Sequence, residues 1–269
     1  MGRLDRLREF VDRLHPSGLL YTTYEHRLIA ELDPVRLPRH VAVLADGNRR
    51  WARANAPGQP LVAGYRAGAD KLEEFVEWCD EIGIPVVTLW VLSTDNFTRS
   101  AGEEIRPLLA VIETMVTNLA ATRRWRVHPV GALDLLPASS AEILKQADRD
   151  TEDLDGMVVN IAVSYGGRHE LRDAVRSLLA EEAHRGTPMS ELAQTLDIEH
   201  IAGHLYTAGQ PDPDLIIRTS GEQRLSGFLM WQSAHSEFYF CEALWPDFRK
   251  VDFIRALRSY GQRERRFGR

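Results

Sequence analysis

Asp46 opens the stretch of this sequence that is best suited to chemistry. It follows an apolar run that ends at Ala45. The residues after it are Gly47, Asn48, Arg49, Arg50 and Trp51. An aspartate here offers a hard oxygen ligand for Mg²⁺, and a glycine lets the backbone approach a ligand closely. A helix that starts near Asn48 would direct free N–H groups at an anion, and two arginines suit phosphate oxygens. The same pattern also fits a plain strand–turn–helix corner with two solvated arginines.

Two arginines six residues apart, Arg218 and Arg224, form a second cluster, and Ser226 follows them. They enclose a hydroxyl and a glycine turn, and a diphosphate accepts several charge-assisted hydrogen bonds from such a set. Surface salt bridges are the competing interpretation. The apolar run 215–217 weakens it, because that run makes Arg218 the last residue of a strand.

The elements that must position these residues follow from the apolar pattern. An apolar run at 41–45 and a near-continuous apolar run at 86–92, typical of strands buried on both faces, predict two strands. Further strands, alternating with helices, are predicted at 126–130, 157–163, 215–218 and 237–241. Apolar residues at helical spacing predict helices at 64–80, 108–119, 139–150, 168–184, within 189–205, and from 251 onward. Residues 53–60 are expected to form a mobile loop. The fold class predicted is α/β: an open, mainly parallel six-stranded sheet flanked by helices, in a single domain.

Two segments are expected in the chain. Residues 1–37, with one or two helices over 4–31, are expected to pack on a catalytic domain formed by residues 38–269. Polar residues follow four of the predicted strands, and ligands bind off the carboxyl ends of such strands, so we expect an active site there. No strand is followed by a dinucleotide or P-loop glycine motif, which disfavours NAD and P-loop nucleotides. Gly64 and Gly68 have the spacing of a membrane dimer motif, but their neighbours are polar.

The net charge of −6 is unevenly distributed. Residues 249–269 carry eight Arg or Lys against Asp252 and Glu264, a local charge of +6 on a remainder of −12. Such a tail is expected to meet an anion, but the acidic body and the lack of a recognisable module disfavour nucleic acid. Two cysteines without metal-ligand spacing and no apolar run of roughly 20 residues favour a cytoplasmic protein. Membrane contact is expected to be peripheral at most.

The stretch from Asp46 to Trp51, after residues 40–44, resembles the first signature of the cis-prenyltransferases, the undecaprenyl diphosphate synthase family. Further matches follow in the right order at residues 93–99, 160–167, 214–231, 237–240 and 263–268. The resemblance implies the cis-prenyltransferase fold and a Mg²⁺-dependent condensation of isopentenyl diphosphate with an allylic diphosphate, geranyl or farnesyl diphosphate. It also implies a homodimer, in which the tail at 263–268 reaches the diphosphate of the partner subunit.

The resemblance also implies roles for individual residues. Asp46 and Glu237 would hold Mg²⁺, and Asn96 matches a position often given the proton-accepting role. Because a neutral amide is a very weak base, we expect Asn96 to orient a diphosphate oxygen or a water that takes the proton. The allylic diphosphate would meet Gly47, Asn48, Arg49, Arg50 and Trp51. Isopentenyl diphosphate would meet Arg218, Arg224, Leu225 and Ser226. The same pocket would be lined by Ser93, Thr94, Asp95, Phe97 and Arg99, although Phe97 could equally be a core aromatic.

Several positions depart from the long-chain pattern of the family. Many long-chain members carry Arg where Leu61 stands and His where Tyr65 stands, and Tyr is common at the His235 position. These departures resemble the short-chain Z-farnesyl diphosphate synthases. Residues two apart on a strand share a face, so Ser93, Val91 and Leu89 are expected to line one wall, with Val91 limiting the tail early. A C15 product from geranyl diphosphate is favoured; a C50–C55 polyprenyl product and a non-catalytic scaffold of the same fold are the alternatives.

Overall fold

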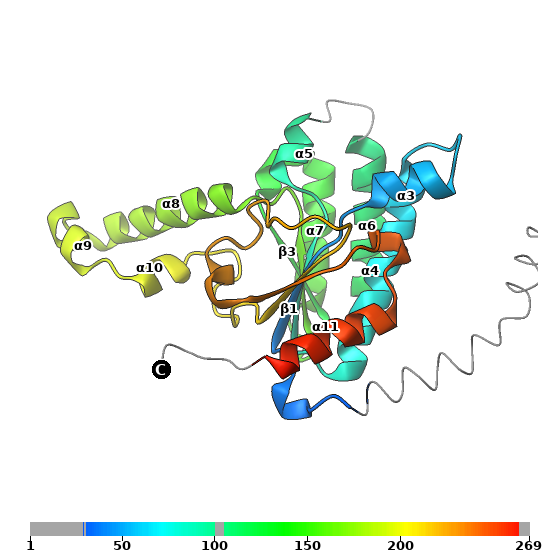
Figure 1. Cartoon of the computed structure of the whole chain (residues 1–269). Coiled ribbons are helices and arrows are strands. Elements are labelled where there is room, and N and C mark those ends of the chain that lie inside the picture. The colour runs from blue at the N-terminus through cyan, green and yellow to red at the C-terminus, as the bar shows by residue number, and fades with distance from the viewer. Residues whose placement is uncertain (1–28, 30, 100–104, 264–269) are drawn as a thin grey trace, which may run out of the picture. The chain divides into compact units, whose positions relative to one another are not determined.

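The computed structural model describes residues 29, 31–99 and 105–263 (Figure 1). The chain forms two compact units, one made of Met1–Leu37 with Arg249–Arg269 and the other of Pro38–Phe248. The first unit contains the short 3₁₀ helix η1 (Pro34–Arg36) and the helix α11 (Lys250–Gln262). Val251 and Ile254 of α11 pack against Ile29 and Leu32. The helices expected over 4–31 lie almost wholly outside the described residues.

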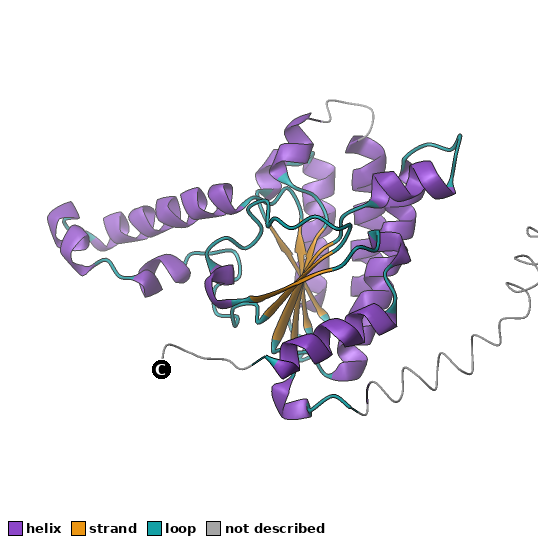
Figure 2. Cartoon of the chain, viewed as in Figure 1, coloured by secondary structure: helices purple, strands orange, loops and turns teal. Residues whose placement is uncertain are grey.

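The second unit contains a sheet of six strands (Figure 2). The strands are β1 (His40–Leu44), β2 (Val86–Trp90), β3 (Arg126–Val130), β4 (Val158–Ala162), β5 (Leu215–Arg218) and β6 (Glu237–Phe240). Their order is β3-β4-β2-β1-β5-β6, and every neighbouring pair is parallel. All five residues of β1 are buried, as expected for a strand covered on both faces. The predicted fold class is confirmed.

Helices α4 (Val62–Ile82), α6 (Ile105–Ala121) and α7 (Ala138–Thr151) pack side by side along one face of the sheet (Figure 1). Gly83 ends α4 in the left-handed region, with φ 85°, and its N–H donates to the carbonyls of Cys79 and Asp80. Pro107 lies in the first turn of α6, where its missing N–H costs no hydrogen bond.

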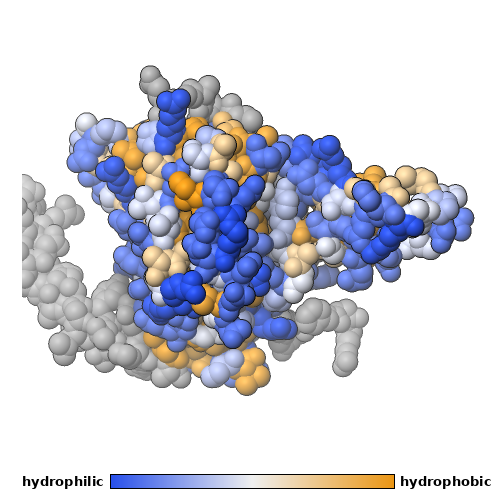
Figure 3. Space-filling model, turned by 180° about the vertical axis from the view of Figure 1, so that it is seen from behind, coloured by the Kyte–Doolittle hydropathy of each residue, from blue (hydrophilic) through white to orange (hydrophobic). Residues whose placement is uncertain are grey.

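The other face is covered by an aromatic cluster and by the long connection after β5. Trp90 stacks on Phe228 with ring centroids 5.1 Å apart, and Tyr165 meets both rings edge-on. Helix α8 (Gly167–Arg185) projects away from the sheet, and the chain comes back through α9 (Met189–Thr195) and α10 (Ile198–Ala202) (Figure 1). These three helices form an arm. Figure 3 shows hydrophobic surface on this otherwise mostly hydrophilic arm. Its exposed apolar side chains include Val175, Leu179, Met189, Leu196 and Ile198.

Two short helices differ from the sequence-based expectation. α3 (Asn48–Asn55) continues through residues 53–55, so the loop expected over 53–60 begins only at Ala56. Ala52 is buried in the packing of α3 on α4, which explains why the chain stays helical there. α5 (Thr94–Arg99) occupies a stretch for which only a polar cluster was predicted.

The register of the three central strands brings their carboxyl ends together. Leu44 pairs with Trp90 of β2 on one side and with Arg218 of β5 on the other. The segments that follow Leu44, Trp90 and Arg218 therefore leave the sheet at one edge, where open parallel sheets bind their ligands.

Candidate active site

A cavity of about 580 Å³ opens at this edge. One wall is polar and comes from the ends of β1, β2 and β5 and from α3 and α5. Its residues include Asp46, Gly47, Asn48, Arg49, Arg50, Arg53, Ser93, Asp95, Asn96, Arg218, Arg224 and Ser226. The other wall is apolar and comes from α4 and α6, with Leu72, Leu108, Val111, Ile112 and Met115. The volume lies within the range of small-molecule sites.

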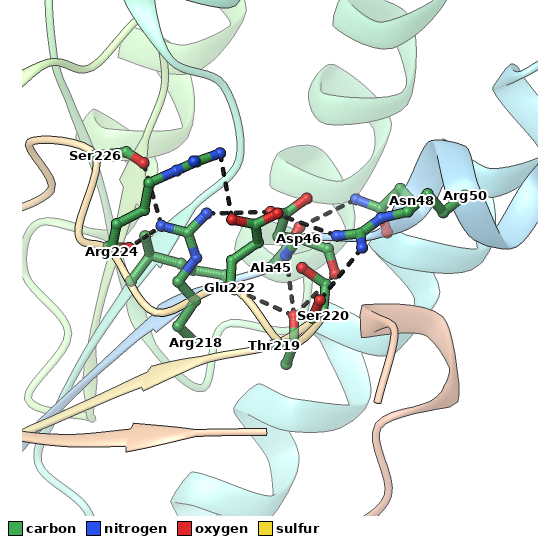
Figure 4. Close-up of polar contacts among 11 residues, drawn as sticks. Ala45, Asp46, Asn48, Arg50, Arg218, Thr219, Ser220, Glu222, Arg224 and Ser226 are labelled. Carbon is green, nitrogen blue, oxygen red and sulfur yellow. Dashed lines mark hydrogen bonds and ion pairs between the residues drawn. The ribbon is translucent and has the colours of Figure 1, made fainter. Parts of the chain in front are cut away.

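Asp46 stands at the centre of the polar wall (Figure 4). Its Oδ2 lies 3.3 Å from Nη2 of Arg218 and 3.9 Å from Nη2 of Arg50. The Oγ1 of Thr219 fixes the backbone, because it accepts from the Asp46 N–H at 3.0 Å and donates to the Asp46 carbonyl at 2.9 Å. The Asp46 side chain remains 44% exposed, so its carboxylate is oriented by two guanidinium groups and still reachable from the cavity.

Three glycines allow α3 to begin beside Asp46. Gly47 has φ 110°, and a Cβ there would lie 2.9 Å from Cδ2 of Leu244. A Cβ at Gly64 would lie 2.2 Å from the Asn48 carbonyl oxygen, and a Cβ at Gly68 would lie 2.4 Å from Asn48 Oδ1. The spacing of Gly64 and Gly68 thus serves the close packing of α3 on α4 within one chain. The first bond of α3 runs from the Trp51 N–H to the Gly47 carbonyl, so the earlier N–H groups have no helical acceptor.

Arg218 is the anchored arginine of the site, with a side chain only 5% exposed. Its Nη1 donates to Ser226 Oγ at 3.1 Å and to the Arg224 carbonyl. Arg224 itself is 71% exposed, with Nη2 3.3 Å from a Glu222 carboxylate oxygen. Arg218 therefore holds the loop that carries Arg224 and Ser226 into the cavity (Figure 4).

The strand expected to run to residue 92 ends at Trp90, and the chain beyond it has a different geometry. The N–H groups of Val91 and Leu92 both point to the Ala162 carbonyl, at 3.1 and 3.3 Å, as in a β-bulge. The bulge ends the alternation of faces, so residues 90–93 all line the cavity. The expectation for Leu89 is wrong, since it is fully buried and is not among the lining residues. Beyond the bulge, Ser93 Oγ accepts from the Asn96 N–H at 3.0 Å and starts α5.

Not every predicted site residue lines the cavity. Trp51 donates its indole N–H to Asp247 at 2.8 Å, and Leu225 packs into the aromatic cluster. Thr94 is buried, with Oγ1 3.4 Å from His169 Nδ1, and Phe97 is half-buried outside the lining. The side chain of Arg99 lies outside the described residues.

Glu237 lies far along the sheet from Asp46. It pairs with Leu215 at the start of β5, whereas Arg218 at the end of β5 pairs with Phe240. One chain therefore does not bring Glu237 and Asp46 together. Among the described residues no group of three or more His, Cys, Asp or Glu side chains is arranged to hold a metal ion.

Sequence reasoning missed one charged residue and most of the apolar wall. Arg53 was assigned to a loop, although it follows Arg49 and Arg50 by about one helical turn. Leu72, Ile112 and Met115 have the spacing of ordinary core positions, and nothing in their pattern distinguishes a cavity wall from a packed core.

A buried carboxyl next to the aromatic cluster supports this edge without lining the cavity. Glu170, at the start of α8, is 1% exposed and accepts from the Tyr165 hydroxyl, from Gln232 at 3.0 Å and from the Tyr206 N–H at 3.0 Å. Burial raises the pKa of the Glu170 carboxyl, while these hydrogen bonds oppose the rise. The network joins the segment after β4, α8, the segment before β5 and the connection after β5.

Comparisons with known proteins give a consistent result. The sequence model of a family described as "Putative undecaprenyl diphosphate synthase" matches residues 44–268. The (2Z,6E)-farnesyl diphosphate synthase of Thermobifida fusca is 61% identical over 93% of this chain and 97% of that protein. The short-chain Z-isoprenyl diphosphate synthase of Mycobacterium leprae is 50% identical over 93% and 95%.

A solved structure supports the same relationship. Lavandulyl diphosphate synthase from Lavandula x intermedia, crystallised with dimethylallyl diphosphate, superposes with a TM-score of 0.80 at 32% identity. The match covers 87% of this chain and 100% of that one. Within the described part of the chain, no helix is long and apolar enough to cross a bilayer.

Proposed function

The chain belongs to the undecaprenyl diphosphate synthase family of prenyltransferases, and from this we propose that it condenses isopentenyl diphosphate with an allylic diphosphate to form a cis double bond. The observation that carries the proposal is the division of one cavity into an arginine-rich wall around Asp46 and an apolar wall from α4 and α6. A prenyl diphosphate has the same division into a charged head and a hydrocarbon tail.

The two diphosphates are assigned to the two clusters of the polar wall. Arg218, Arg224 and Ser226 bind isopentenyl diphosphate, because the buried Arg218 holds the other two in place for charge-assisted hydrogen bonds. The start of α3, with its free N–H groups and with Arg49 and Arg50, binds the allylic diphosphate. Neutralising that diphosphate by fixed positive charge assists its departure.

Mg²⁺ is the proposed cofactor, and the polar wall fits it in one respect. Mg²⁺ is usually held by one or two carboxylates together with substrate phosphates, and Asp46 offers one partly exposed carboxylate. When bound, the ion would neutralise phosphate charge at the leaving group. A metal role for Glu237 requires a second copy of the chain, because within one chain it lies near the opposite end of the sheet.

The proton lost from isopentenyl diphosphate needs an acceptor at the cavity. Asn96 lines the cavity and its backbone is fixed by Ser93. Since a neutral amide is a very weak base, Asn96 is assigned the role of orienting a diphosphate oxygen or water that takes the proton. Asp95 and Ser93 contribute to the same wall.

The proposed product is C15 (2Z,6E)-farnesyl diphosphate from geranyl diphosphate. Val91 lines the cavity, and a branched side chain there narrows the space for a tail. The relatives named for short-chain products favour the same length. A C50–C55 polyprenyl product is the second candidate.

We also propose a homodimer with sites completed by the basic tail. The described residues end at Arg263, so the proposal rests on the charge of the tail and on the position of Glu237. Light scattering is expected to show a dimer, and deletion of residues 263–269 is expected to lower activity without loss of helix signal. An active monomer would contradict this assembly.

The proposed reaction is tested by incubating the protein with Mg²⁺, geranyl diphosphate and radiolabelled isopentenyl diphosphate, then sizing the extracted products. We expect label in a C15 alcohol after phosphatase treatment, with the new double bond in cis geometry. No incorporation, or a trans product, would reject the proposed reaction. Products of C50 or longer would leave the reaction in place and reject the short-chain assignment.

A further inference from the structure

The polar wall of the cavity carries more positive than negative charge. Five arginines and two carboxylates are among its lining residues. The arginines are Arg49, Arg50, Arg53, Arg218 and Arg224, and the carboxylates are Asp46 and Asp95. An excess of this size inside one cavity raises the local concentration of anions.

Three of the five arginines have protein partners. Arg50 and Arg218 share the carboxylate of Asp46. Arg50 also donates to the Ser220 carbonyl at 3.3 Å, and Arg224 pairs with a glutamate on its own loop. These contacts position the three side chains within the protein.

Arg49 and Arg53 differ from the other three. No hydrogen bond or ion pair links either guanidinium to another described residue, although both residues line the cavity. They stand four positions apart on α3, where like charges repel each other and destabilise the helix. α3 has no acidic residue in its first turn to offset them. A ligand anion is the partner that this pair lacks.

The geometry of α3 directs Arg53 toward the diphosphate end of the cavity. Cα–Cβ bonds tilt toward the start of a helix, so a long side chain at Arg53 covers the turn that begins at Asn48. The wall that faces α3 comes from the first turns of α4, with Tyr65, Gly68 and Ala69. None of these three carries a charge, so α3 is the source of cations on this side of the cavity.

We propose that Arg53, with Arg49, binds the diphosphate of the allylic substrate, so that Arg53 is a further substrate-binding residue. The inference rests on the proposed function and extends it to a residue outside the diphosphate-binding signature. The two guanidinium groups offer planar, paired donors to the phosphate oxygens. An anionic lipid headgroup presents the same phosphate chemistry, and the experiment separates the two sources.

The test compares Arg53→Gln and Arg53→Lys with Arg66→Gln. Arg66 is an exposed arginine on α4 that lies outside the cavity and has no partner among the described residues, which makes it a matched control. We expect Arg53→Gln to raise KM for geranyl diphosphate about tenfold, equivalent to about 1.4 kcal/mol, with KM for isopentenyl diphosphate unchanged. Arg53→Lys should recover part of the loss, and Arg66→Gln should match the wild type.

A second readout does not depend on turnover. Calorimetric titration with inorganic pyrophosphate should show weaker binding to Arg53→Gln than to Arg66→Gln, whereas cosedimentation with phosphatidylglycerol vesicles should be the same for both. An unchanged allylic KM and unchanged pyrophosphate affinity in an active Arg53→Gln protein would overturn the inference while leaving the proposed function standing. Reduced vesicle binding with unchanged allylic KM would assign the charge to a lipid surface and equally overturn it. A wild type that incorporates no isopentenyl diphosphate would reject the proposed function itself.

Discussion

Toward the amino-terminal ends of the strands, four polar side chains hydrogen-bond to one another, whereas at the carboxyl edge several buried ones are left without partners. His40 places Nδ1 2.7 Å from the Pro211 carbonyl and Nε2 2.8 Å from Thr88 Oγ1. Asn160 donates to Thr88 at 3.0 Å and exchanges amide hydrogen bonds with Gln210 at 2.6 and 3.1 Å. We call His40, Thr88, Asn160 and Gln210 the closed network.

The carboxyl edge has the opposite character. Asn48 Oδ1, Arg218 Nε and Ser220 Oγ are buried without a hydrogen-bond partner. Ser220 and Ser226 adopt positive φ values of 76° and 51°, which are unfavourable for side chains larger than glycine. Folded proteins rarely leave buried polar groups unpaired or hold such backbone strain without a functional reason. The difference indicates that the closed network stabilises the sheet, while the carboxyl edge is built to take partners from a ligand.

Asp46→Ala should give the largest effect on the carboxyl edge. Loss of the central carboxylate removes the proposed Mg²⁺ ligand and the acceptor that orients Arg50 and Arg218, so we expect kcat/KM to fall about 10³-fold or more. The fold should survive, which a thermal melt followed by circular dichroism would check. Asp46→Asn keeps the shape and separates charge from packing. Full activity of Asp46→Ala at ordinary Mg²⁺ concentration would rule out the metal role.

The closed network should respond to pH through stability. Burial lowers the pKa of His40 to about 4, while the hydrogen bond to the Pro211 carbonyl opposes the shift. In the unfolded chain the pKa is about 6.5, so the unfolded state takes up the proton first. The contribution of the neutral His40 to the free energy of unfolding is therefore fully present above about pH 6.5. As pH falls toward 4, about 3 kcal/mol of this free energy is lost.

Urea unfolding at pH 7 and pH 4.5 measures this loss. His40→Gln removes the titrating ring and should flatten the pH dependence of the unfolding free energy, whereas His184→Gln on exposed surface should not. Activity per folded molecule of His40→Gln should stay close to wild type at pH 7. An equally steep pH dependence in His40→Gln would mean that the closed network is not the source.

Arg218→Ala and Arg224→Ala compare a buried and an exposed arginine within the carboxyl edge. Arg218 is 5% exposed and holds the loop of Arg224 and Ser226, so its loss should raise KM for isopentenyl diphosphate about 30-fold. Arg224 is 71% exposed and already paired with Glu222, so Arg224→Ala should raise KM for isopentenyl diphosphate only about fivefold. Steady-state kinetics with each substrate varied in turn distinguishes the two diphosphate sites. A change confined to the allylic KM would reverse their assignment.

The six strands and the edge of the sheet that carries the site could be predicted from the sequence, because apolar runs and the polar residues after them are local signals. Sequence reasoning did not reach the bulge at Val91 and Leu92, which depends on a carbonyl of Ala162 in a neighbouring strand. It also could not separate the cavity wall of α4 and α6 from core, since both have helical apolar spacing. The family resemblance supplied a role for Glu237, but the position of Glu237 relative to Asp46 became visible only from the strand register.

Val91→Ala is expected to have the smallest effect on the rate, and it tests whether Val91, in the bulge, limits the length of the hydrocarbon tail that the cavity accepts. Because the alternation of faces ends at Trp90, Val91 lines the cavity together with both of its neighbours, and removal of two methyl groups widens the space where the tail passes. With excess isopentenyl diphosphate we expect products longer by at least one isoprene unit and little change in the total rate of incorporation. Val175→Ala makes the same substitution at a 41% exposed position of α8, outside the cavity, and should leave the products unchanged. If Val91→Ala also leaves them unchanged, the limit lies deeper, at Leu72, Ile112 and Met115, where α4 and α6 close the wall.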